Sequence, residues 1–388
     1  MGIMSNTVSI CQFMVAGEIP AADLFTWASG RLSGNGFKSI DQGTAELSVG
    51  WVHTGNHQES AFAVPADFWH DHYLSFSLRQ DRRKIPASLL KAYMQVAEHE
   101  YLAANPGFRW VPKQKKQELL DTVRTGILAR TLPVPTVHDA VWDVKTGILT
   151  LTTLARPAVE LFETEFKKTF PGLRLLAIHP YARGEQVVNG PLQGHLRTFN
   201  KAGSEAALDL IQSNRWLGED FLLWLMFQTM NTPSEYRAGR PGPALPDEQF
   251  VAYLNDRLVL CSNADAGLQK ITVAGPQDRF SEVCTALRSG KAISEATLYF
   301  EKAEDVWKMT LKGDTFHFAS YKAPKVKEEK DNTVDEASER EALFFERMHL
   351  LETGLQLFDS LYADYLEERL TPAWESKLTL IKEWLETP

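Results

Sequence analysis

The segment 79–130 constrains the fold most, because it holds two helix patterns separated by a clear stop. Apolar residues recur at three- and four-residue steps over residues 89–102, behind Pro86, which suits the first turn of a helix. Asn105–Gly107 interrupts this pattern, and a second helix is predicted from about Lys113 to Ala129. Two helices joined by such a short connection form a helical hairpin.

The same segment is basic although the chain is acidic. It holds eleven basic and five acidic residues, a net charge of +6, whereas the whole chain carries −9. A localised positive surface on an acidic protein can bind phosphate groups while the remainder avoids polyanions. The predicted DNA-binding residues are Arg79, Arg82, Arg83, Lys84, Lys91, Arg109, Lys113, Lys115, Lys116, Arg124 and Arg130.

Three of these lysines, Lys113, Lys115 and Lys116, occupy the first turn of the second helix. Positive charge there opposes the helix dipole and costs about 0.3–1 kcal/mol per exposed residue, so helix stability does not explain it. Ammonium groups beside backbone N–H groups would suit phosphate oxygens. The alternative is a solvated basic face without a partner, which is common for charge runs. Because no zinc-finger, RNP-like or basic-zipper motif accompanies the segment, any DNA binding should be directed to the backbone.

The remaining pattern predicts an α+β protein with mixed antiparallel sheets. Strands are expected at 7–16, 46–53 and 73–78, and a meander at 296–320, with helices between them. The expected parts are a β-rich part at 1–80, the basic hairpin or tip at 81–135, a central α/β part with an insertion at 136–240, a strand-rich part at 241–324, a charged mobile linker at 325–340 and C-terminal helices at 341–388. Residues 181–196, rich in Gly, Pro and polar groups, are expected to form a loop or an insertion, and the proline-rich stretch 233–246 a linker or an extended crossing.

The three cysteines, Cys11, Cys261 and Cys284, are far apart and form no CxxC or Cys/His cluster. This usage indicates a reduced intracellular protein without a disulfide framework or structural zinc. No secretory signal and no apolar run long enough to cross a bilayer are visible, so a cytoplasmic location is expected.

Catalytic motifs are sparse. Asp143–Lys145 has the D-x-K spacing of some nuclease cores, with Asp139 nearby, but Lys145–Gly147 fits a hairpin turn equally well. The pairs His53 with His57 and His70 with His72 lack a third ligand. We therefore expect no metal, no cofactor and no enzymatic activity.

Several short motifs, taken in order, resemble the RdgC family of bacterial recombination-associated DNA-binding proteins. Each is modest alone, and their order over most of the chain is the specific signal. They are Gly50–Val52, Arg83–Pro86, Ile127–Pro133, Val141–Asp143 with Thr146–Gly147, Phe170–Gly172, Ile178–Pro180, Trp216–Leu225 and Gly290–Lys291.

The resemblance implies a horseshoe-like subunit that pairs into a ring-shaped homodimer around duplex DNA, without sequence preference. It also implies a nucleoid-associated protein that limits filament formation or strand exchange by the recombinase RecA. Arg109 and Arg130 match DNA-facing arginines near the family's tip, and Leu132 stands where a dimer-gate phenylalanine is expected. The gate pattern Pro-Arg-Ala-Phe reads Ala129–Leu132 here, so the aromatic side chain is replaced by leucine.

Three functions follow as hypotheses. The first is a non-enzymatic, sequence-nonspecific DNA-binding protein, with duplex as the expected form and single-stranded DNA left open. Six to ten phosphate contacts would then cost roughly 10³–10⁵ in affinity between 50 and 200 mM salt. The second is a metal-dependent DNA exonuclease that depends on Asp143. The third is a protein-interaction module whose basic tip meets an acidic partner.

Overall fold

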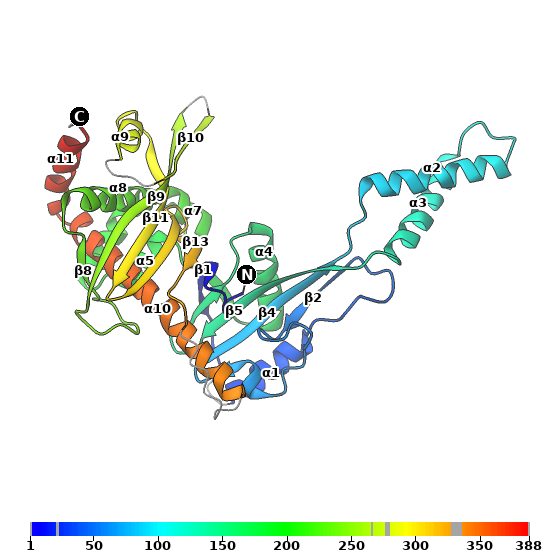
Figure 1. Cartoon of the computed structure of the whole chain (residues 1–388), viewed down its shortest axis with the longest axis horizontal. Helices are drawn as coiled ribbons and strands as arrows, with labels where there is room; N and C mark the ends of the chain where they lie inside the picture. Colours follow the sequence, from blue (N-terminus) through cyan, green and yellow to red (C-terminus); the bar gives the residue numbers. More distant parts are fainter. Residues whose placement is uncertain (1, 21–22, 265–266, 276–279, 327–335, 387–388) are drawn as a thin grey trace. The chain divides into compact units, whose positions relative to one another are not determined.

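The computed structural model describes residues 2–20, 23–264, 267–275, 280–326 and 336–386. Over these residues the chain is a mixed α+β protein with antiparallel strand pairing, as the sequence predicts (Figure 1). It divides into two compact units, each assembled from separated stretches. Unit 1 comprises residues 1–17, 142–160 and 174–388, and unit 2 comprises residues 18–141 and 161–173.

Unit 2 is built on three neighbouring strands in the order β5-β4-β2. Alternation along β4 places Leu74, Phe76 and Leu78 on one face, and Phe76 packs there with Trp51 and Phe162. The indole Nε1 of Trp51 donates to the Thr169 hydroxyl over 2.6 Å, so this fully buried aromatic residue also has its polar atom satisfied. The elements of unit 2 are α1 (Leu24–Gly34), β2 (Leu47–Val52), a 3₁₀ turn (Pro65–Asp67), β3 (Trp69–His70), β4 (Tyr73–Arg82), α2 (Ala87–Ala104), α3 (Lys113–Leu128), β5 (Val134–Asp143) and the second half of α4 (Arg156–Thr169).

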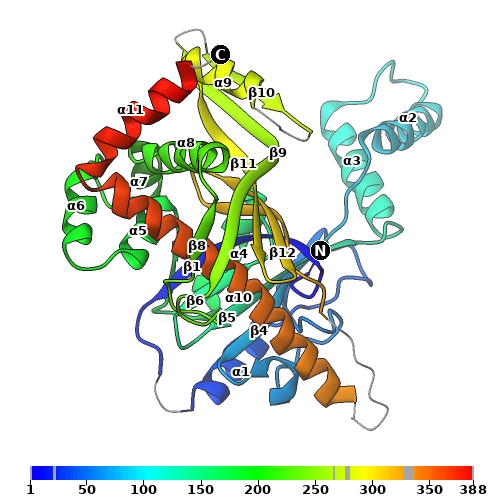
Figure 2. The ribbon, with the colours of Figure 1, turned by 60° about the vertical axis from the view of Figure 1, so that its left-hand side comes forward.

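Unit 1 holds a larger sheet in the order β10-β9-β11-β12-β13-β1-β6, with β7 paired to β1 and β8 to β9. Helices α8 and α10 pack on this unit's strands (Figure 2), where Phe221, Phe316 and Phe358 meet edge to face. The elements are β1 (Thr7–Ala16), β6 (Ile148–Leu151), the first part of α4, β7 (Arg174–Ala177), α5 (Pro180–Val187), α6 (Pro191–Phe199), α7 (Ala207–Ser213), α8 (Trp216–Asn231), β8 (Glu235–Arg237), β9 (Gln249–Ala264), β10 (Gly267–Val273), α9 (Ser281–Arg288), β11 (Ala292–Lys302), β12 (Asp305–Lys312), β13 (His317–Lys322), α10 (Glu336–Arg369) and α11 (Ala373–Glu386).

One glycine shows how tightly unit 1 is packed. A Cβ on Gly218 of α8 would lie 1.8 Å from the carbonyl oxygen of Gly313, at the turn between β12 and β13. Because that neighbour is backbone, it cannot move aside, and only glycine allows α8 to approach the sheet this closely.

Three sequence expectations need correction. Residues 181–196 do not form a loop: they lie in helices α5 and α6, each of which begins with a proline at its first position. The expected linker 325–340 is wrong for residues 336–340, which begin α10, and its part 327–335 lies outside the described residues. Strand β4 continues to Arg82, so Arg79 is a strand residue and does not follow the strand.

Candidate nucleic-acid interface

The helical hairpin forms at the predicted place in unit 2. The chain leaves β4, runs through α2, turns at residues 105–112 and returns through α3 into β5 (Figure 1). The tip loop, which we define as residues 105–112, begins with a turn in which the Phe108 N–H donates to the Asn105 carbonyl over 3.1 Å. An ion pair of 2.7 Å between Lys116 of α3 and Glu98 of α2 joins the two helices.

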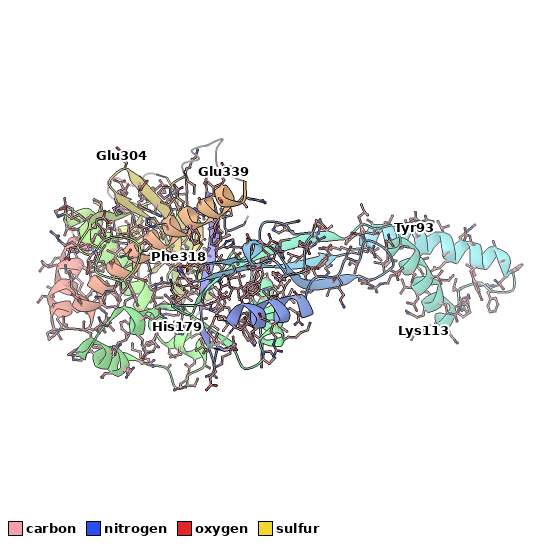
Figure 3. The ribbon with its side chains drawn as sticks, turned by 90° about the horizontal axis from the view of Figure 1, so that it is seen from below. Tyr93, Lys113, His179, Glu304, Phe318 and Glu339 are labelled. Atoms are coloured by element: carbon pink, nitrogen blue, oxygen red, sulfur yellow. The ribbon has the colours of Figure 1, made fainter. Side chains whose placement is uncertain are left out.

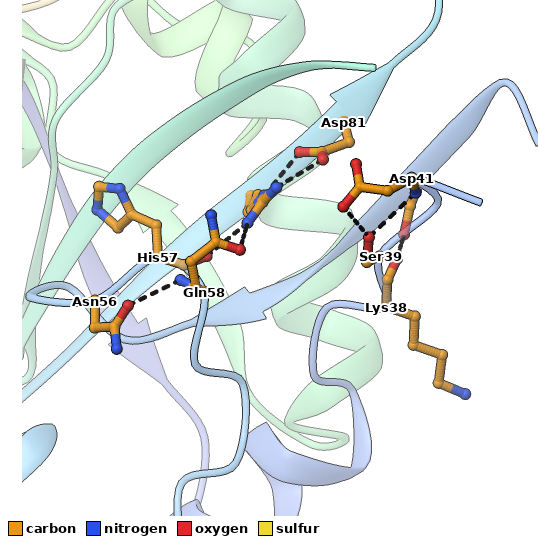
Figure 4. A network of polar contacts seen from close by, with 9 residues as sticks. Lys38, Ser39, Asp41, Asn56, His57, Gln58 and Asp81 are labelled. Atoms are coloured by element: carbon orange, nitrogen blue, oxygen red, sulfur yellow. Dashed lines mark hydrogen bonds and ion pairs between the residues drawn. The ribbon is translucent and has the colours of Figure 1, made fainter. Parts of the chain in front are cut away.

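Two of the predicted DNA-binding arginines belong to the interior of unit 2. Arg79 is only 6% exposed and pairs bidentately with Asp81, with both N–O distances at 2.8 Å. Its guanidinium also donates to the His57 carbonyl and to Gln58 Oε1, two residues that are labelled in Figure 4 together with Asp81. The guanidinium carbon lies 4.3 Å from the ring centroid of Phe37. The structure therefore removes Arg79 from the candidate interface, because its guanidinium is buried and four of its five N–H groups already donate within unit 2.

Arg83 is 3% exposed and holds a loop together from within. One terminal nitrogen donates to the carbonyls of Gly43 and Ala45, and the other to those of Ile40 and Asp41, over 2.7–3.0 Å. These four hydrogen bonds use the donors that phosphate would need. Arg83 is a structural residue and leaves the candidate interface as well.

Three further basic residues are exposed but paired with glutamate. Lys115 pairs with Glu118, Lys116 with Glu98, and Arg124 binds Glu46 with two hydrogen bonds of 2.8 and 3.1 Å. Hydrogen bonding to Glu118 raises the pKa of Lys115, and hydrogen bonding to Glu46 raises that of Arg124. Exposed pairs of this kind are weak, so they lower the local positive charge but do not hold the basic side chains strongly.

The other six basic residues remain as candidate phosphate ligands. Their side chains are exposed and form no ion pair within the described part of the chain; they are Arg82, Lys84, Lys91, Arg109, Lys113 and Arg130. We call them the hairpin cations. They lie at the end of β4, between β4 and α2, on α2 and α3, in the tip loop and just after α3. Lys113 is labelled at the start of α3 in Figure 3.

The hairpin also exposes an unusual amount of apolar surface. Trp110 is 74% and Leu132 77% exposed, and Phe108, Val96 and Val134 are each more than half exposed. Only Met94, Ile127 and Leu128 of the two helices are buried. Large apolar side chains gathered on one projection are more typical of a binding surface than of a solvated face.

A pocket of about 310 Å³ lies between the two helices. Leu89 and Tyr93 of α2 line one side, and Val123 and Ile127 of α3 line the other, with Arg130 at the same pocket. Tyr93 is labelled on α2 in Figure 3. An apolar pocket beside a cation can accept an apolar side chain or the face of a ring.

The aspartate and the histidines that the sequence offered for nuclease or metal chemistry take part in local contacts. Asp143 accepts hydrogen bonds from the N–H of Lys145 (2.8 Å) and the hydroxyl of Thr146 (2.6 Å), and Gly147 completes the turn with φ 74°. The described residues contain no group of three or more His, Cys, Asp or Glu side chains that could hold a metal ion. The D-x-K spacing is thus a turn signature here.

Three of the four histidines in the two pairs make local contacts of their own. His53 is buried against Phe62, with ring centroids 4.7 Å apart, and its Nε2 lies 3.2 Å from the Ala61 carbonyl oxygen. His57 lies 3.9 Å from Asp139, and His72 Nδ1 lies 2.5 Å from a carboxylate oxygen of Asp71. These contacts are those of packed or locally paired histidines.

Sequence reasoning overlooked Phe108 and Trp110. Two aromatic residues flanking an arginine, inside a turn bounded by Pro106 and Pro112, were the available signal. A turn between two surface helices is exposed, so an apolar ring placed there is unusual.

Neither protein-family models nor curated proteins give a match to this chain. Among the helices that the structure describes, none combines the length and the apolar character needed to cross a membrane.

Proposed function

We propose that this chain is a sequence-nonspecific DNA-binding protein without catalytic activity, and that the helical hairpin is its DNA-binding surface. The observation that carries the proposal is the set of six hairpin cations, which are exposed and lack an acidic partner among the described residues. Phosphate oxygens are the partner that such a set fits, because contacts to the backbone require charge and reach but no base-reading motif.

The acidic remainder of the protein supports a localised contact. With a net charge of −9 overall, the surface outside the hairpin repels DNA, and the duplex is directed to the hairpin. This arrangement favours one defined site over diffuse adsorption.

Self-association belongs to the same proposal. Leu132 is 77% exposed. The pocket lined by Leu89, Tyr93, Val123 and Ile127 offers an apolar site that an apolar side chain such as leucine can enter. We propose a homodimer in which the Leu132 regions of two copies meet and enclose duplex DNA. In the cell such a dimer would associate with the nucleoid in the cytoplasm and modulate recombinase-dependent recombination, as the resemblance to the RdgC family implies.

A charge-reversal variant tests the DNA-binding surface. Arg109→Glu/Lys113→Glu/Arg130→Glu should abolish the gel shift of unrelated duplex sequences at low salt, and should do so equally for all of them. The matched control is Lys167→Glu/Arg174→Glu/Lys382→Glu, which changes net charge by the same amount at exposed positions outside the hairpin. If the hairpin variant shifted duplex as well as the wild type, the proposed site would be wrong.

A further inference from the structure

The tip loop carries aromatic residues that phosphate binding does not use. Trp110 is 74% and Phe108 51% exposed, and they flank Arg109. Trp110 makes no ring contact among the described residues, whereas Phe108 lies beside Tyr101 of α2, with ring centroids 6.3 Å apart. An indole this exposed contributes nothing to the core of unit 2, so its placement requires another explanation.

Hydrogen bonds order the first half of the loop, which carries Phe108. The Asn105 side chain donates to the Tyr101 carbonyl over 2.8 Å, and the Phe108 N–H donates to the Asn105 carbonyl over 3.1 Å. Pro106 and Pro112 restrict the backbone on either side. A pre-ordered loop loses less conformational entropy when a ligand stacks on it.

The charges around the rings select the kind of ligand. Arg109 lies between them, and Lys113 begins α3 directly after the loop; both are exposed and unpaired within the described residues. Flat apolar faces alternating with cations match a chain of flat bases joined by phosphates. The faces of bases are covered in a duplex, and opening a base step costs a few kcal/mol, so the fit is to unpaired nucleotides.

We infer that the tip loop is a base-stacking site for single-stranded DNA, in which Trp110 and Phe108 stack on unpaired bases while Arg109 and Lys113 bind the adjoining phosphates. The inference rests on the proposed function, and it names the residues of the same hairpin that would bind unpaired nucleotides and the way in which they would bind them. Stacking on an aromatic ring is tolerant of base identity, which agrees with binding that is independent of sequence.

The test compares single-stranded and duplex affinities in full-length protein. The probes are a thymidine oligomer of about 15 nucleotides and a duplex of equal length, both labelled with fluorescein. Binding of the protein to each probe is measured by fluorescence anisotropy at one salt concentration. Trp110→Ala should weaken binding to the oligomer by about 5- to 100-fold, and binding to the duplex by less than about twofold. Trp110→Phe should keep most of the affinity because it keeps a ring. The control Leu245→Ala removes an equally exposed apolar residue (71%) of unit 1 and should change neither affinity.

A second readout follows the ring itself. Binding of the thymidine oligomer should quench tryptophan fluorescence in the wild type, and Trp110→Phe should lose that quenching while it still binds. Equal losses on both probes with Trp110→Ala, or no loss on either, would overturn the stacking site and leave the proposed function standing. A wild type that binds neither probe would overturn both.

An apolar loop with cations could instead meet an anionic lipid surface. Vesicles of phosphatidylglycerol and phosphatidylcholine provide that arm of the test. If Trp110→Ala abolished binding to vesicles and left the oligomer affinity unchanged, the stacking site would be wrong.

Discussion

At the scale of single residues, the arginines of the basic segment have opposite roles although they are close in sequence. Arg79 shares a strand face with Asp81, because residues two apart in a strand point the same way, and the two form a buried pair. Arg82 of the same strand is exposed. The sequence predicted one uniform basic cluster because its charges were counted without regard to the strand face on which each residue lies. The two-residue spacing of Arg79 and Asp81 was the signal that could have separated the buried arginine from the exposed one.

The buried pair gives the first prediction. Arg79→Ala should lower the free energy of unfolding by about 3–5 kcal/mol, since it leaves the Asp81 carboxylate buried without a partner. Arg82→Ala should change that free energy by less than about 0.5 kcal/mol, because its side chain is exposed. Urea unfolding followed by circular dichroism measures both, and equal stabilities of the two variants would contradict the assignment.

Among the elements, those with strong local signals were predicted well. Helices α2 and α3 lie within about one residue of expectation because an apolar period, Pro86 and an Asn-Pro-Gly stop all agree. The strands β1, β2 and β11 to β13 were also predicted from their patterns and are confirmed.

Helices α5 and α6 were missed because their sequence contains Gly184, Gly190, Pro191 and Gly194. Tertiary contacts override that composition. A Cβ on Gly184 would lie 3.0 Å from Leu196 of α6, so the glycine permits close packing of the two helices. The Tyr362 hydroxyl of α10 donates to the Pro180 carbonyl over 3.1 Å. Neither contact can be read from local sequence.

The start of α5 gives a prediction about pH. Burial lowers the pKa of His179, the N-cap residue of α5, from 6.5 to about 4. Between these values the unfolded chain binds a proton that the folded chain does not, so the stabilisation is complete above pH 6.5 and is lost as the pH falls. The expected loss from His179 is about 2 kcal/mol between pH 8 and pH 5.

His179→Asn should reduce this pH dependence by about 2 kcal/mol, because asparagine keeps an N-cap acceptor and does not titrate. His317, whose pKa burial also lowers to about 4, is present in both proteins and cancels in the comparison. Urea unfolding at pH 8, 6.5 and 5 measures the difference, and parallel curves for the two proteins would rule out His179 as a source.

On the scale of the whole molecule, the proposed dimer gives a prediction about mass in solution. Leu132→Asp should weaken self-association by about 10- to 100-fold, because burying one leucine is worth about 1.5–3 kcal/mol. The control is Leu245→Asp at a residue that is 71% exposed in unit 1. Sedimentation equilibrium measures both, and unchanged self-association of Leu132→Asp would exclude Leu132 from the contact.

The central claim concerns where an acidic protein binds a polyanion, and the salt dependence of duplex affinity tests it most directly. The slope of log K against log salt counts the phosphates that the protein neutralises. Arg109→Ala/Lys113→Ala/Arg130→Ala should reduce the magnitude of that negative slope by about three for each protein copy in contact. Lys167→Ala/Arg174→Ala/Lys382→Ala should leave the slope unchanged. Identical slopes for the wild type and the hairpin variant would contradict the account.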